Sequence, residues 1–183
     1  MKKTPTIFAR NPADMSRVIP QEHPDCAWVF AGEGVATRKY DGTCCMVRDG
    51  KLFKRRELKG GKQPPAGFEL ADTDHVTGKV VGWVPVTDAP EDKYHAAAFV
   101  PGLEDGTYEL LGPSVQGNPE GEATHILLRH ADAEVLEAPR TFAGLREWMA
   151  GKNIEGIVWH HPDGRMAKLK LRDFGLRRGA GES

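Results

Sequence analysis

The fold of this chain is limited most by a series of short β-like runs that turn signals separate. The runs at 35–40, 43–47 and 51–56 favour strands, and Asp-Gly pairs at 41–42 and 49–50 lie between them. An Asp-Gly pair between two such runs is a strong signal for a tight hairpin, because both residues tolerate the backbone conformation that the turn needs. We therefore expect consecutive hairpins, and so antiparallel pairing, in this part of the chain.

The rest of the chain adds further strands and two helices. The turn Pro162-Asp163-Gly164 predicts a second hairpin, and the longer helix has Thr141 as a candidate N-cap and Gly151 as a stop. No internal repeat and no interdomain linker interrupts the chain. We predict an α+β fold, with antiparallel sheets and packed helices, in a single domain of residues 1–183. The expected elements are strands at 78–86, 106–112, 124–130, 154–161 and 165–173, helices at 90–99 and 141–153, and loops at 58–67 and 112–123.

Composition is that of a globular protein with room for one sizeable core. The chain has 183 residues, of which 39% are apolar and 28% charged. No apolar run is long enough to span a membrane, and Arg10 and Asp14 break the N-terminal stretch that a secretory signal would need. Cys26, Cys44 and Cys45 form neither a disulfide framework nor a zinc spacing. These features predict a cytoplasmic protein with no membrane partner.

Charge is nearly balanced over the whole chain but uneven along it. The formal net charge of −1 argues against a protein that coats nucleic acid by charge alone. Residues 51–62 nevertheless hold six basic residues against Glu57, and residues 165–178 hold six against Asp173. Such runs are usually solvated surfaces, and the alternative is two walls of one anion site. Composition does not decide between them.

The last predicted hairpin groups charges of both signs. Along a strand Lys168 and Lys170 share one face, while Leu169 lies on the other face and supplies core. Glu155 stands just before the strand that must pair with this one. A carboxylate near two ammonium groups suits a metal–phosphate centre, although a lone strand of this kind is usually a solvated edge.

Lys39 opens the sequence Lys-Tyr-Asp-Gly, where it is either an ordinary solvated cation or a nucleophile. Four other motifs follow it in a defined order. This order and spacing resemble the covalent nucleotidyltransferases, which include ATP-dependent DNA ligases, RNA ligases and mRNA capping enzymes. The resemblance covers residues 35–172 and implies a minimal nucleotidyltransferase domain with an ATP-grasp-like ligase fold. The motifs are "KYDG" at 39, "FKRRE" at 53–57, "YELLG" at 108–112, "EGIV" at 155–158 and "KLK" at 168–170.

The resemblance implies a role for each matching residue. Lys39 would attack the α-phosphorus of ATP and hold AMP as a phosphoramidate, which requires the neutral amine. Asp41 and Gly42 would shape the turn beside Lys39, and Glu155 would hold the catalytic Mg²⁺ or Mn²⁺ through water. The other implied ATP contacts are Arg55 or its neighbour Arg56 at the sugar and phosphate, Glu109 at the ribose, and Lys168 and Lys170 at the α-phosphate.

Two departures from the family pattern narrow the expectation. The family places an aromatic residue on adenine after the third motif, whereas residues 124–130 offer only His125 and His130, so the stacking residue stays open. The chain ends ten residues after Asp173, without the oligonucleotide-binding barrel that follows in DNA ligases and capping enzymes. Together with the run "DGTCC", this resembles a family of compact 5′-to-3′ RNA-joining ligases.

The expected partners are therefore RNA ends. The resemblance implies joining of a 5′-phosphate to a 3′-hydroxyl in RNA repair, with Arg177 and Arg178 as candidate RNA contacts. Two alternatives stay open: a non-ligating nucleotide- or RNA-binding module of the same fold, and an enzyme that passes AMP to a protein or a small molecule. The sequence leaves the oligomeric state open.

Overall fold

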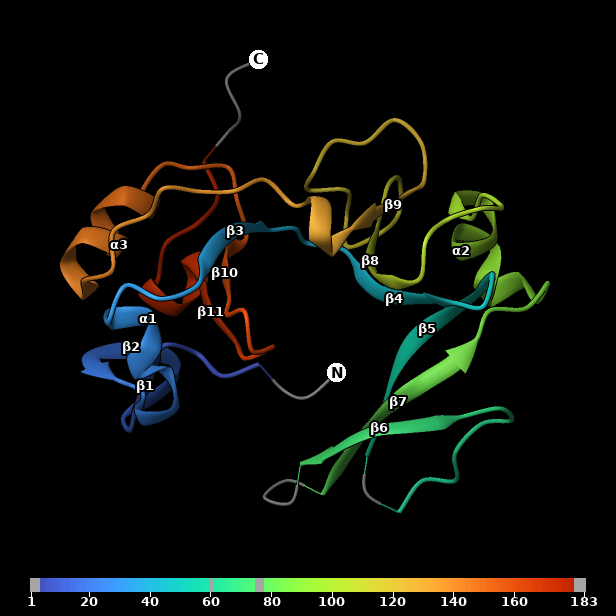
Figure 1. Ribbon diagram of the computed structural model, residues 1–183, viewed down its shortest axis with the longest axis horizontal. Coiled ribbons are helices and arrows are strands. Elements are labelled where there is room, and N and C mark those ends of the chain that lie inside the picture. The colour runs from blue at the N-terminus through green and yellow to red at the C-terminus, as the bar shows by residue number, and fades with distance from the viewer. Residues whose placement is uncertain (1–3, 60, 75–77, 180–183) are drawn as a thin grey trace. The chain divides into compact units, whose positions relative to one another are not determined.

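The structure is a computed structural model that describes residues 4–59, 61–74 and 78–179 (Figure 1). The chain divides into two compact units. We call residues 4–40 and 133–179 the Lys39 unit, and residues 41–132 the Glu109 unit. Each unit has its own sheet and its own buried core. The expectation of a single domain over residues 1–183 stays a prediction.

The Lys39 unit is built on an antiparallel sheet in the order β11-β10-β3. β3 spans Val35–Lys39, β10 spans Gly156–His160 and β11 spans Met166–Lys170. Two short segments widen this sheet at its edges: Thr6 pairs in parallel with Lys168, and Val135 pairs antiparallel with Thr37. The hairpin predicted around residues 162–164 joins β10 to β11 and is confirmed.

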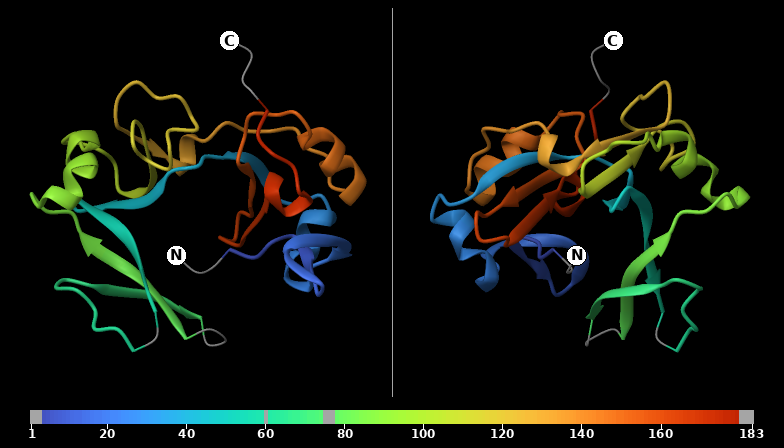
Figure 2. Two further views of the ribbon diagram at one scale, coloured as in Figure 1. Left: turned by 180° about the vertical axis from the view of Figure 1, so that it is seen from behind. Right: turned by 45° about the vertical axis from the view of Figure 1, so that its right-hand side comes forward.

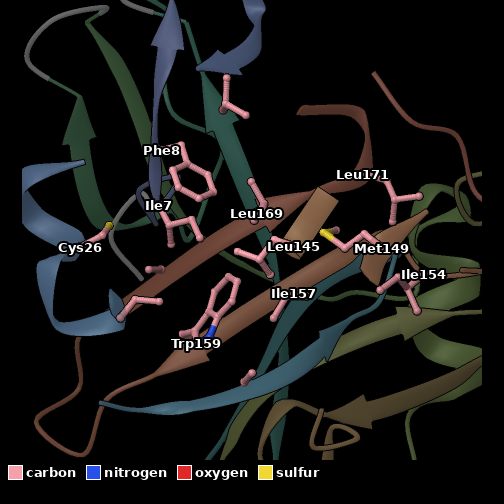
Figure 3. Close-up of a cluster of buried hydrophobic side chains, with 14 of the residues drawn as sticks. Ile7, Phe8, Cys26, Leu145, Met149, Ile154, Ile157, Trp159, Leu169 and Leu171 are labelled. Atoms are coloured by element: carbon pink, nitrogen blue, oxygen red, sulfur yellow. The ribbon is translucent and has the colours of Figure 1, made fainter. Parts of the chain in front are cut away.

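One face of this sheet makes the core of the Lys39 unit. Side chains alternate along a strand, so Ile157 and Trp159 of β10 and Leu169 of β11 point to the same side, where all three are fully buried (Figure 3). Helix α3 contributes Leu145 and Met149 to the same cluster. The other face of the sheet carries the alternate residues, among them the lysines of the predicted site.

Short elements complete the Lys39 unit. Thr141 caps α3 as predicted, with its hydroxyl accepting from the Gly144 N–H at 3.2 Å. The hairpin of β1 and β2 and the helical segments that follow it were not predicted, because β2 is largely exposed and its pairing with β1 is irregular. The elements are β1 (Phe8–Asn11), β2 (Asp14–Glu22), η1 (Pro24–Cys26), α1 (Ala27–Phe30), α3 (Phe142–Met149) and η4 (Leu171–Phe174).

The Glu109 unit is a six-stranded antiparallel sheet in the order β6-β7-β5-β4-β8-β9. The long strands β5 and β7 run side by side in every view (Figures 1 and 2). Its core includes Cys45, Leu52, Tyr108 and Leu110. The elements are β4 (Thr43–Arg48), β5 (Lys51–Leu58), β6 (Glu69–Asp74), β7 (Lys79–Pro85), η2 (Pro90–Asp92), α2 (Lys93–Ala98), β8 (Gly106–Leu111), β9 (Ile126–Arg129) and η3 (His130–Asp132).

The predicted fold class is confirmed, since both main sheets are antiparallel and a few helices accompany them. The hairpin at residues 49–50 is also confirmed, with Asp49 and Gly50 both at positive φ. In the loop expected at 58–67, Leu58 still belongs to β5, and Gly60 lies outside the described residues.

The hairpin expected around Asp41 and Gly42 is wrong. β3 pairs with β10, and β4 pairs with β5 and β8, so these two strands belong to different sheets. The Asp-Gly pair instead starts the Glu109 unit. Gly42 is needed there for a close approach, because a Cβ atom at this position would lie 2.2 Å from the Leu110 carbonyl oxygen.

Candidate active site

Three charged side chains of the Lys39 unit form one connected group. Gly156 of β10 is paired with Lys39 of β3 on one side and with Lys170 of β11 on the other. Glu155 precedes this glycine, and its carboxylate bridges the two lysines: Oε2 accepts from Lys39 Nζ at 2.5 Å, and Oε1 accepts from Lys170 Nζ. The side chains of Lys39, Glu155 and Lys170 are only 21%, 13% and 17% exposed. The sequence-predicted nucleophile, metal ligand and phosphate contact therefore touch.

Gly156 makes this arrangement possible. A Cβ atom at Gly156 would lie 2.1 Å from the Leu169 carbonyl oxygen and 2.9 Å from the Lys170 Cα atom. Only glycine fits in the central strand between the two lysine-bearing strands. The Glu-Gly pair of the motif thus has two parts, a bridging carboxylate and a residue that lets the neighbouring strand approach.

The bridging carboxylate is held in its ionised form. Burial by itself raises the pKa of the Glu155 carboxyl, but Lys39 and Lys170 oppose this with their charges and hydrogen bonds, and the net pKa lies below its ordinary value. Glu155 is therefore a carboxylate at neutral pH, as a metal ligand or a partner of ammonium groups must be.

Lys168 lies one step further along the same face, opposite Val158 of β10. The pKa of its ammonium is lowered to about 8, chiefly by burial and also by the positive charges of Lys170 and Lys39, while Asp173 and Glu155 act in the opposite direction. A lysine in this state loses much of its hydration without a full partner charge. Such a lysine is a candidate contact for an external anion, and that role stays a prediction.

This position costs stability, and we expect Lys168→Met to raise the melting temperature at neutral pH. The folded protein holds the Lys168 proton less tightly than the unfolded chain, so wild-type stability rises with pH between about 8 and the ordinary pKa of 10.5. The advantage of the variant should shrink over that interval and be largest below it. Melting curves of both proteins across the pH series check this, and a difference independent of pH would contradict it.

In the Glu109 unit, Glu109 is bound on both carboxylate oxygens. Its Oε1 accepts from the Gly42 N–H at 3.2 Å, and its Oε2 lies 2.9 Å from Nε2 of His130. Nδ1 of the same imidazole lies 2.9 Å from the Thr107 hydroxyl. Glu109 is 9% exposed, and its carboxylate is held in one orientation by the Gly42 N–H and by His130. Sequence reasoning weighed His130 only as a stacking residue and missed this contact.

The strand register separates Arg55 from Arg56. Glu109 of β8 is opposite Cys44 of β4, and the next residue of β4, Cys45, is opposite Lys54 of β5. Arg55 therefore shares the sheet face of Glu109, whereas Arg56 lies on the opposite face and is exposed. The geometry favours Arg55 as the nucleotide contact, and the role of either arginine stays a prediction.

The adenine-stacking residue also stays open. His125 is already engaged, because its ring stacks on Tyr94 with centroids 4.5 Å apart and its Nε2 lies 2.5 Å from the Pro113 carbonyl oxygen. Trp83 and Trp159 are buried, and Trp148 packs against the Lys39-unit core, so these three rings serve the cores of the two units.

Comparison with known proteins adds to this geometry. A family model described as RNA ligase 1 matches residues 91–182, half of the chain, which contain Glu109, Glu155, Lys168 and Lys170. RNA ligase 1 of Danio rerio is 32% identical, over 78% of this chain and 67% of that protein. The chain belongs to the RNA ligase 1 family. RNA ligase 1 of Rattus norvegicus is 26% identical and that of Pongo abelii 24% identical, each over the same shares.

The family assignment leaves the roles of the terminal arginines as predictions. Arg177 is exposed, whereas Arg178 donates from Nε to the Asn153 side chain at 3.1 Å and from Nη2 to the Asn153 carbonyl at 3.3 Å. Arg38 donates to the same carbonyl at 3.2 Å. Arg178 therefore has a structural contact, and Arg177 is the better candidate for contact with RNA in this RNA ligase family member.

Within the described residues there is no group of three or more His, Cys, Asp or Glu side chains that could enclose a metal ion. Glu155 offers a single ionised carboxylate, which fits Mg²⁺ or Mn²⁺ kept largely hydrated rather than caged by the protein. In the described part of the chain, no helix is both long enough and apolar enough to cross a membrane.

Proposed function

We propose that this RNA ligase 1 family member is an ATP-dependent enzyme that joins 5′-phosphate and 3′-hydroxyl RNA ends through a lysine–AMP intermediate. The observation that carries the proposal is the Lys39–Glu155–Lys170 group, with Lys168 on the same sheet face. A solvated surface would not place three partly buried lysines on one sheet face with a carboxylate that contacts two of them, because like charges repel and lose hydration together.

In the first step, Lys39 acts on ATP as the substrate. The neutral Nζ forms a bond to the α-phosphorus, the bond from that phosphorus to the bridging oxygen breaks, and pyrophosphate leaves with the electron pair. The lost amine proton passes to solvent or to the leaving group. Lys168 and Lys170 stabilise the charge that develops on the α-phosphate oxygens, where preorganised cations have the largest effect on rate.

Glu155 has two tasks in this proposal. It holds Lys39 and Lys170 in place before substrate binds, and it is the candidate ligand for Mg²⁺ or Mn²⁺. A bound divalent ion would neutralise part of the phosphate charge. Glu109 and Arg55 are the candidates for contact with the ribose and phosphate of ATP.

Two further steps complete the proposed reaction. The 5′-phosphate of one RNA strand attacks the AMP phosphorus and releases the Lys39 amine, which leaves an AMP-capped end. The 3′-hydroxyl oxygen of the other strand then attacks the capped phosphate, forms the phosphodiester bond and releases AMP. Each step exchanges one bond at phosphorus for another, so no other reactant is needed.

The decisive experiment is incubation of the protein with ATP labelled at the α-phosphate and with Mg²⁺, followed by a denaturing gel. Label that stays on the protein supports the enzyme, and absence of label supports a non-ligating binding module. Addition of 5′-phosphorylated RNA should move the label to RNA and then release it as AMP. Label that moves to protein or to a small molecule instead would support an AMP transferase and overturn the RNA ligase proposal.

We expect RNA to be preferred over DNA at the 3′ end. RNA and DNA differ there in the 2′-hydroxyl and the sugar geometry, which a contact near the ends can read. RNA binding through phosphate contacts on a protein of net charge −1 should also weaken as salt rises, with a slope that is shallow if the contacts are few. Single-turnover joining by adenylylated protein, with RNA and DNA strands of one sequence across a salt series, measures both effects. Equal rates on the two acceptors would contradict this expectation.

The matched variant for this experiment is Arg177→Ala. It should slow the steps that use RNA and leave protein–AMP formation unchanged, because Arg177 is exposed and its assigned role is in RNA contact. If the variant joins RNA at the wild-type rate at every salt concentration, Arg177 does not contact RNA.

A further inference from the structure

Asp173 is a buried carboxylate that the proposed reaction does not use. It is 2% exposed and lies in η4, directly after the lysine strand β11. One oxygen, Oδ2, accepts from the backbone N–H of Lys170 at 2.8 Å. The other, Oδ1, accepts from Nη1 of Arg10 at 2.7 Å. A buried charge held at this place needs an explanation, because burying a carboxylate is costly unless it is paired.

Arg10 connects the same carboxylate to the segment beside Lys168. Its Nη2 donates to the Thr6 hydroxyl at 3.0 Å. Thr6 lies between Pro5 and Ile7, which bind the backbone of Lys168 from both sides: the Lys168 N–H donates to the Pro5 carbonyl at 2.9 Å, and the Ile7 N–H donates to the Lys168 carbonyl at 3.0 Å. The Arg10 guanidinium thus contacts both groups that hold the β11 backbone: the Asp173 carboxylate, which binds Lys170, and the segment around Thr6, which binds Lys168.

These hydrogen bonds to the β11 backbone oppose the electrostatic repulsion among the lysines of the site. Lys39, Lys168 and Lys170 share one face, and a single carboxylate, Glu155, contacts two of them. The three ammonium groups repel one another, which disfavours this arrangement unless the position of β11 is fixed. In the described residues β11 is paired with β10 on one side and with the short segment around Thr6 on the other. A displacement of about 1 Å at a catalytic group lowers a rate by roughly 100-fold.

We propose that Arg10 is a positioning residue for adenylylation. It fixes the position of Lys170 through Asp173 and the position of Lys168 through Thr6. This inference rests on the proposed function, because it assigns Arg10 a role in the step that Lys168 and Lys170 assist. Arg10 touches neither lysine side chain among its described contacts and acts only through these backbone attachments.

The test compares Arg10→Ala with Arg17→Ala in the full chain. Arg17, on the adjacent strand β2, donates to the Arg172 carbonyl at 2.9 Å, so it ties the same hairpin to the same region without reaching Asp173 or Thr6 in the described structure. With labelled ATP and Mg²⁺, Arg10→Ala should lower the maximal single-turnover rate by about 100-fold, with little change in the KM for ATP. Arg17→Ala should keep the wild-type rate.

Two more variants separate positioning from folding. In Arg10→Lys the new side chain can reach Asp173 but not Thr6 at the same time, so this variant should recover part of the rate. Asp173→Asn keeps an acceptor for the Lys170 N–H but loses the negative charge that pairs with Arg10. It should therefore lose rate as Arg10→Ala does. Rates are compared only for protein that melts cooperatively. The inference is overturned if folded Asp173→Asn and Arg10→Lys keep the wild-type rate, or if Arg17→Ala loses as much rate as Arg10→Ala. If the wild-type protein takes no label, the proposed function is overturned instead.

Discussion

Lys39→Arg will form no protein–AMP, and Lys39→Ala will form none either. Arginine keeps the positive charge and can still pair with Glu155, so the fold and the charge of the site are retained. Its guanidinium does not lose a proton at any usable pH and so cannot supply the free electron pair that attacks phosphorus. Retention of label from ATP, measured on a denaturing gel, is expected to fall below detection in both variants.

The matched control for this prediction is Lys54→Arg. Lys54 is also a half-buried lysine paired with a carboxylate, that of Asp92, which the Thr87 N–H and hydroxyl bind as well. It lies on the sheet face opposite Arg55 and has no role in the proposed chemistry. Label should therefore persist in Lys54→Arg. Covalent AMP on Lys39→Arg would mean that another residue is the nucleophile.

Sequence reasoning succeeded where the deciding signal is local. The turns at residues 49–50 and 162–164 are specified by a few residues with a known backbone preference, and both hairpins form. The same signal failed at Asp41 and Gly42, because β3 and β4 both find better partners far along the chain. Local turn chemistry does not report which distant strand competes for an edge.

Part of the candidate site was also predictable from local sequence patterns. The alternation of β11 and the position of Glu155 before β10 were enough to place Glu155 near the lysine pair, and the structure adds that it bridges Lys39 as well. Arg10 and Asp173 were not predictable, since they are 163 positions apart and carry no motif. Pairs of this kind follow from how the β1–β2 hairpin packs beside η4, which a strand pattern does not encode.

Glu155→Ala will remove adenylylation and will also lower stability, and the two effects separate the proposed roles of this carboxylate. Loss of a metal ligand and of the order it gives to Lys39 and Lys170 should cost several kcal/mol in the transition state, about a 100-fold or larger fall in rate. The variant also leaves two largely buried ammonium groups without their carboxylate, at a cost of about 1–3 kcal/mol to folding. Glu155→Asp should recover only part of the rate, because its carboxylate is one methylene shorter and cannot reach both lysines as Glu155 does.

The control is Glu134→Ala, which removes an exposed carboxylate that lies 3.6 Å from Arg38, in the same unit and beside the same strand β3. Exposed pairs contribute little, so this variant should keep both its melting temperature and its rate. Melting curves and single-turnover labelling are measured on one preparation of each variant. If Glu155→Ala melts earlier but labels at the wild-type rate when folded, Glu155 only pairs with the lysines for stability, and the metal would then have to be held without it.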